Sequence, residues 1–187
     1  MDFESRIKPM MSEKRYIHSL GVRDEAVKLA KVYGADEKKA YLAGLLHDVV
    51  KEFSPEQMRE LAKKYGVKLS EVVLHEPKLV HGILGAYYVK YEFGIDDDEI
   101  FDAIYYHTTS KANMPLLTKI IYIADSIEPN RDFDGVCELR AATYENLDKA
   151  ILMSLRKTID KLLKNGRLIH VETVNAMNYL LMKGCGI

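Results

Sequence analysis

An apolar stretch that ends in an adjacent imidazole and carboxylate sets the strongest limit on how this chain folds, because both polar groups need partners inside a core. The stretch reads Ala43-Gly44-Leu45-Leu46-His47-Asp48. Neighbouring helical residues diverge by about 100° around the axis, so His47 and Asp48 cannot share one face, yet both can approach one point. A carboxylate can bridge two cations while the imidazole beside it binds one. The pair is a candidate anchor for a metal cluster; the alternative is an ordinary helix end with a solvated Asp48.

Four other apolar helical segments each carry one further candidate ligand. These residues are His18, His81, His107 and Asp125. An unpaired buried carboxylate costs on the order of several kcal/mol, so Asp125 needs a cation, an arginine or several hydrogen-bond donors. A single histidine in such a segment is more often a core residue than a ligand. Five segments with the same residue types together favour one shared metal centre.

Length and charge limit the class of protein. The 187 residues suffice for one domain with a substantial core, and no shift in composition marks a second, so we expect a single domain over residues 1–187. Lys plus Arg number 27 and Asp plus Glu 28, a formal net charge of −1. This balance argues against nucleic acid or an anionic membrane as a partner. Phosphate binding would have to be local.

Cysteine usage and the N-terminal sequence favour a cytoplasmic protein. Cys137 and Cys185 lie far apart and form no metal-binding or redox motif, which suits free thiols in a reducing compartment. The first residues lack the apolar segment of a signal peptide, and no apolar run is long enough to span a bilayer.

The apolar periodicity predicts an all-α fold, since no alternating run indicates a sheet. We expect a core of helices over about residues 15–134, and further helices over about 142–183 that complete the bundle. Ser54 and Gln57 form a capping-box pattern, and Gly34 and Gly66 follow two predicted helices. His75 lies two residues before Pro77, so we place it in a surface loop and not at the metal centre.

Several polar residues near the candidate ligands have phosphate-binding chemistry. Thr108, Thr109 and Lys111 follow His107 and supply two hydroxyl groups and one cation. Arg131 lies in the turn after Asp125, and a guanidinium can hold a phosphate through two hydrogen bonds. The alternatives are an ordinary polar loop and a solvated arginine.

These motifs together resemble the HD-domain phosphohydrolases and, among them, the YqeK-type symmetrical bis(5′-nucleosyl)-tetraphosphatases. The resemblance covers about residues 15–178 and rests on Arg15-Tyr16-Ile17-His18, Ala43-Gly44-Leu45-Leu46-His47-Asp48 with Lys51, His81-Gly82, His107-Thr108-Thr109, Asn113-Met114 and Ala124-Asp125-Ser126-Ile127-Glu128-Pro129-Asn130-Arg131. One departure is Ser110-Lys111, where the family usually has glycine and then a basic residue.

The resemblance implies an all-helical bundle with a metal centre between its helices. Four imidazoles and two carboxylates without a thiolate suit first-row metals. The resemblance further implies two ions, with iron expected and manganese, other first-row ions or magnesium as alternatives. One ion would be held by His18, His47, Asp48 and Asp125, and the other by Asp48, His81 and His107. Asp48 would then be the bridge.

The implied reaction converts diadenosine tetraphosphate and water to two ADP. Asp48 would serve catalysis by holding both ions, and a metal-bound hydroxide would attack phosphorus. The expected substrate contacts are Arg131, Lys111, Thr108 and Thr109, with Lys51, His170 and Thr173 as weaker candidates. The family usually has a proline between the residues that correspond to His170 and Thr173, and this chain lacks it. Other nucleotide hydrolysis, a di-iron oxygenase, a non-catalytic nucleotide-binding module and a homodimer all remain open at this stage.

Overall fold

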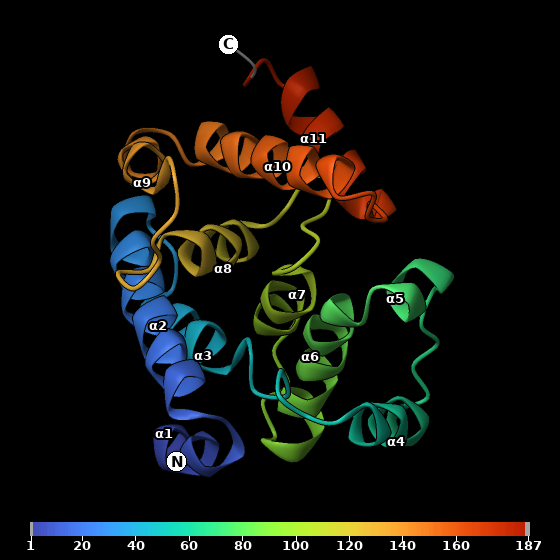
Figure 1. Cartoon of the computed structure of the whole chain (residues 1–187). Coiled ribbons are helices and arrows are strands. Elements are labelled where there is room, and N and C mark those ends of the chain that lie inside the picture. Colours follow the sequence, from blue (N-terminus) through green and yellow to red (C-terminus); the bar gives the residue numbers. More distant parts are fainter. Residues whose placement is uncertain (1, 186–187) are drawn as a thin grey trace.

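The computed structural model describes residues 2–185, and every regular element in that range is a helix (Figure 1), which confirms the predicted all-α class. In chain order the elements are α1 (Phe3–Ile7), η1 (Lys8–Met10), α2 (Glu13–Tyr33), α3 (Glu37–Leu46), α4 (Pro55–Tyr65), α5 (Glu71–His75), η2 (Pro77–Leu79), α6 (Val80–Glu92), α7 (Asp98–Tyr106), α8 (Leu116–Ile127), α9 (Val136–Glu145), α10 (Leu147–Lys164) and α11 (Val171–Met182). Among the described residues, no helix is long and apolar enough to cross a membrane.

The helix ends follow local signals that were visible in the sequence. The Ser54 hydroxyl accepts a hydrogen bond from the Gln57 amide while the Gln57 side chain bonds back to Ser54, which completes the capping box of α4. Gly34 ends α2 with φ 75° and Gly66 ends α4 with φ 65°, a left-handed conformation that glycine adopts without a steric penalty.

Helix α8 lies at the centre of the bundle, against α2, α3, α7 and α10 (Figure 1). Its residues Ile120, Ile121 and Ile123 are fully buried, and each such side chain contributes roughly 1.5–3 kcal/mol of transfer free energy. This burial holds the last turn of α8, which carries Asp125, beside the ends of the neighbouring helices.

Close packing of α2 on α3 depends on Gly44. A Cβ atom at this position would lie 2.8 Å from the Cα of Arg23, closer than two such carbons can approach. The missing side chain lets the two backbones meet, so α3 ends next to the middle of α2. This contact brings the residues that follow α3 toward His18.

The region around His75 differs from the prediction. His75 is the last residue of the short helix α5 and not part of a loop, because Ser70 caps that helix and Pro77 begins the separate 3-10 turn η2. The expected surface position is confirmed, since His75 is exposed and its Nδ1 donates to the carbonyl of Glu71 at 2.8 Å. Cys137 and Cys185 are free cysteines.

Candidate metal centre

Five helices deliver the six candidate ligands to one place. His18 lies within α2, and His47 and Asp48 follow the last turn of α3. The other three are His81 in the first turn of α6, His107 at the end of α7 and Asp125 in the last turn of α8. The structure therefore brings together residues spread over more than one hundred positions of the chain.

The two oxygens of Asp48 face two different pairs of imidazoles. Its Oδ1 lies 2.9 Å from the Nε2 of His81 and 3.5 Å from the Nε2 of His107. Its Oδ2 lies 3.4 Å from the Nε2 of His47 and 3.8 Å from the Nε2 of His18. Each oxygen of Asp48 therefore has its own group of nitrogen atoms beside it.

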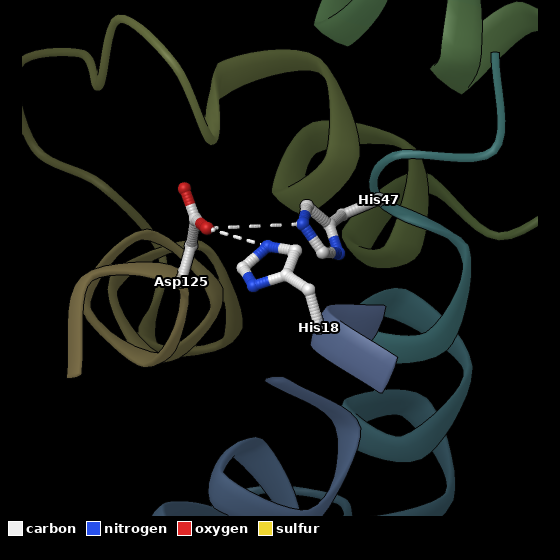
Figure 2. Close-up of side chains that lie close together, drawn as sticks. All are labelled: His18, His47 and Asp125. Carbon is white, nitrogen blue, oxygen red and sulfur yellow. Dashed lines mark ion pairs between the residues drawn. The ribbon is translucent and has the colours of Figure 1, made fainter. Parts of the chain in front are cut away.

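Asp125 completes the ligand group on the side of His18 and His47. Its Oδ1 lies 3.0 Å from the Nε2 of His18 and 3.9 Å from the Nε2 of His47, and Figure 2 shows both rings turned toward this oxygen. The ligand atoms of these three residues lie within 4.8 Å of one another, as do those of His47, Asp48 and His107. Both groups have the dimensions of a metal-binding site.

Backbone carbonyls set the protonation of two of the rings. The Nδ1 of His47 lies 2.8 Å from the carbonyl oxygen of Gly44, and the Nδ1 of His107 lies 2.7 Å from that of Ile104. A carbonyl only accepts, so each Nδ1 must carry the proton. The Nε2 atom of each ring then faces the centre, while Nδ1 is held by the backbone, as in most metal-binding histidines.

The buried polar atoms of the centre fit a cation. The Nε2 atoms of His18 and His47 and the Oδ1 of Asp48 are buried and have no hydrogen-bond partner in the described residues. Leaving such atoms unsatisfied costs about 1–3 kcal/mol each. All of them are nitrogen or oxygen ligands, so metal ions of the first-row type satisfy them.

Electrostatics keep these groups in the protonation state that metal binding needs. Burial alone would raise the pKa of Asp48, but the imidazoles of His47, His107 and His81 beside it outweigh burial and hold that pKa well below its usual value. Burial lowers the pKa of His81 to about 4. Near neutral pH the carboxylate is therefore charged and the His81 ring is neutral.

Three cations surround the ligand carboxylates. Arg15 Nη1 lies 2.6 Å from Asp48 Oδ2, and Arg131 Nη2 lies 2.5 Å from Asp125 Oδ1. Lys51 Nζ lies 2.8 Å from His81 Nε2 and 3.7 Å from Asp48 Oδ1. Burial lowers the pKa of Lys51.

Two residues of this site, Arg15 and Glu128, were part of the motifs of the resemblance but were given no role from the sequence. Arg15 lies three residues before His18, so the two share a helix face, and this spacing was the available signal. Glu128 is buried, and its Oε1 lies 3.0 Å from the Nδ1 of His18. The corresponding signal for Glu128 was its position directly after the helix that carries Asp125.

Most of the other expected substrate contacts make bonds within their own segments or to neighbouring helices, and none of their side chains is bonded to one of the six ligands within the described residues. Lys111 lies 2.5 Å from the Asp102 carboxylate, so its charge is paired away from the ligands. The Thr108 hydroxyl is buried and has no hydrogen-bond partner within residues 2–185. Thr173 donates to the carbonyl of Thr109 at 2.8 Å, and the remaining candidate, His170, caps α11.

Ser110 stands where the family usually has glycine, and it adopts a left-handed backbone with φ 59°. Serine reaches this region at a steric cost that glycine avoids, and its loop is stabilised by contacts on both sides. Ser110 is fully buried, and its amide donates to the Tyr106 carbonyl at 2.7 Å. The departure in sequence therefore keeps a backbone conformation suited to glycine.

Comparison with known proteins identifies the family. The HD domain model matches residues 15–130. "Bis(5'-nucleosyl)-tetraphosphatase, symmetrical" of Halalkalibacterium halodurans is 44% identical over 95% of this chain and 94% of its own length. The Bacillus subtilis protein of the same name is 39% identical, with 94% of each chain covered.

A solved structure agrees over nearly the whole chain. A predicted HD superfamily hydrolase involved in NAD metabolism from Clostridium acetobutylicum has a TM-score of 0.93 and 44% identity, and the match covers 96% of this chain and 95% of that one. Fold, ligand pattern and relatives thus agree: the chain belongs to the HD domain family, within the group of symmetrical bis(5′-nucleosyl)-tetraphosphatases.

Proposed function

We propose that this chain is a metal-dependent hydrolase that converts diadenosine tetraphosphate and water to two ADP. The observation that carries the proposal is the convergence of His18, His47, Asp48, His81, His107 and Asp125 in a chain whose relatives of similar length bear the name of that enzyme. A third such relative, from Staphylococcus aureus, is 36% identical over 92% of this chain.

The proposed cofactor is a pair of metal ions, with iron as the native metal and manganese, other first-row ions or magnesium as alternatives. Support for two ions comes from Asp48, whose oxygens face separate imidazole pairs. Such ions would supply a water molecule of lowered pKa as the nucleophile near neutral pH and would offset charge on the phosphoryl oxygens. Asp48 would hold both ions, so it is the residue on which the centre would depend most.

The protein's own cations orient the substrate. Lys51 and Arg15 lie against His81 and Asp48, and Arg131 lies against Asp125, so a polyphosphate that reaches the ligands meets positive charge on several sides. Such charge holds one bridging bond in line for attack. Arg131, Lys111, Thr108 and Thr109 remain our proposed contacts, with His170 and Thr173 as weaker ones.

The cations also distinguish this function from the second candidate. A di-iron oxygenase acting on a carbon substrate has no need for Lys51, Arg15 and Arg131 around its ligands, whereas an anionic nucleotide does. The balanced net charge and free cysteines support action on free nucleotides in the cytoplasm. We leave a homodimer as a proposal for measurement.

Turnover by protein purified without oxygen, with its metals quantified, tests the function. Diadenosine tetraphosphate should yield ADP alone, and water enriched in heavy oxygen should label one of the two ADP molecules. AMP plus ATP as products would contradict symmetrical cleavage. Oxygen consumption on a carbon substrate without nucleotide hydrolysis would support the oxygenase.

A further inference from the structure

We propose that the cavity between α4, α5 and α6 binds one nucleoside of the substrate, with its base packed on the apolar wall and its phosphates directed to the metal centre. The inference rests on the proposed function. The cavity has a volume of about 560 Å³ and lies beside the chain segment that follows Asp48. This size is within the range of small-ligand sites, about 300–1,000 Å³.

The cavity is continuous with the metal centre. His81 and Lys51 line its inner end, and the same two residues contact Asp48. A ligand in the cavity therefore begins at the candidate metal ligands and extends away from them. This continuity points to a part of the substrate as the occupant and not to a separate effector or a protein partner.

The wall of the cavity matches the face of a nucleobase. Phe53, Met58 and Ala62 line one part of it, and Val67 and Leu69 line another. Bases bind through their flat faces to apolar and aromatic side chains, at about 1–3 kcal/mol per stacked base. A phosphate group alone would gain nothing from this wall.

Positive charge lies where the phosphates of such a ligand would run. Lys51 stands at the inner end, and Lys78 lines the cavity as an exposed residue. Arg59 also lines it and is paired with the Glu56 carboxylate at 2.7 Å. No carboxylate lines it among the described residues. An apolar wall with cations alone is complementary to a nucleoside that carries a polyphosphate.

The wall is built before any ligand arrives. Helix α4 is held to α6 by Tyr65 and Lys64, whose side chains lie 2.8 Å and 2.6 Å from the Glu92 carboxylate. A small apolar cluster that includes Val73, Val80 and partly buried Met58 packs beneath it. A preformed wall lowers the entropy cost of binding.

Photolabelling of the wild-type, metal-loaded protein tests the site directly. 8-Azidoadenosine diphosphate should label residues within 53–81, and unmodified ADP should protect them. Labelling confined to other parts of the chain would overturn the cavity as the base site. The result stands apart from turnover: a failure to hydrolyse diadenosine tetraphosphate would count against the proposed function, not against a labelled cavity.

A cavity-filling variant supplies the second test. Ala62→Phe should weaken ADP binding about tenfold or more and leave the affinity for inorganic phosphate unchanged, since phosphate needs only the metals and cations. Ala141→Phe, at an exposed position of α9, is the matched control and should bind ADP as the wild type does. Unchanged ADP affinity in a folded Ala62→Phe protein would overturn the proposal. If that variant fails to fold, the photolabelling decides.

Discussion

The carboxylate of Glu128 holds the ring of His18 from behind. Glu128 is 2% exposed, and its Oε1 lies 3.0 Å from the Nδ1 of His18, whose Nε2 faces Asp125. Its other oxygen, Oε2, accepts hydrogen bonds from the Asn130 amide at 2.7 Å and side chain at 3.0 Å. A carboxylate so fixed orients the imidazole and raises its basicity as a ligand.

Glu128→Gln should therefore lower metal affinity about 10- to 100-fold, because the amide cannot accept the Nδ1 proton with the same strength. Calorimetric titration of the metal-free variant with manganese measures the change. Glu145→Gln, at an exposed site at the end of α9, is the control and should bind as the parent does. Equal affinities in both variants would show that Glu128 does not support His18.

Asp48→Ala should remove nearly all bound metal and activity, whereas His81→Ala should mainly empty one of two positions. The asymmetry follows from Asp48, whose two oxygens face both imidazole pairs. Elemental analysis after dialysis gives the metal content per chain. His75→Ala is the control, since His75 is exposed. Full metal content in the Asp48 variant would rule out the bridge.

Lys51→Met should lower kcat/KM by about tenfold to a hundredfold and leave the metals bound. Its ammonium lies at the candidate ligands, 2.8 Å from the Nε2 of His81, where it can pair with a phosphate of the substrate, and a hydrogen bond to a charged group contributes about 1.5–3 kcal/mol. Steady-state kinetics together with metal analysis check both parts. Lys63→Met, exposed on α4, should behave as the wild type. A variant that loses metal as Asp48→Ala does would assign Lys51 to the ligand group instead.

Gly44→Ala should destabilise the protein by about 1–3 kcal/mol, because the added Cβ would lie 2.8 Å from the Cα of Arg23 and force α2 and α3 apart. Thermal unfolding should show a melting temperature lowered by several degrees. At Gly85 an added Cβ would have no atom nearer than 3.6 Å, so Gly85→Ala should keep or raise stability. If Gly44→Ala melted at the same temperature as the wild type, α2 and α3 would have to adjust freely to the added methyl group.

The substrate contacts show where prediction from the sequence reached its limit. Lys51 was a weak candidate, yet it contacts His81, while the favoured Lys111 pairs with Asp102. Both lysines follow a candidate ligand by a few residues in the sequence. Spacing along the sequence cannot predict which of the two lysines lies at the ligands. The direction of each long side chain depends on which neighbour in space offers a carboxylate or an imidazole.

Most helices, several of their ends and the residue types of the candidate metal centre could be predicted from the sequence, because caps and apolar periodicity act over about four residues. The capping box of Ser54 and Gln57 is such a case. The short helix α5, predicted as a loop around His75, is the exception. Pairings across helices were decided only by the tertiary structure. Glu128 meets His18 across 110 positions, and Arg15 meets Asp48 across 33. Such contacts form only when packed helices bring the two side chains together. The sequence around either residue does not contain information on how far apart they will lie in space.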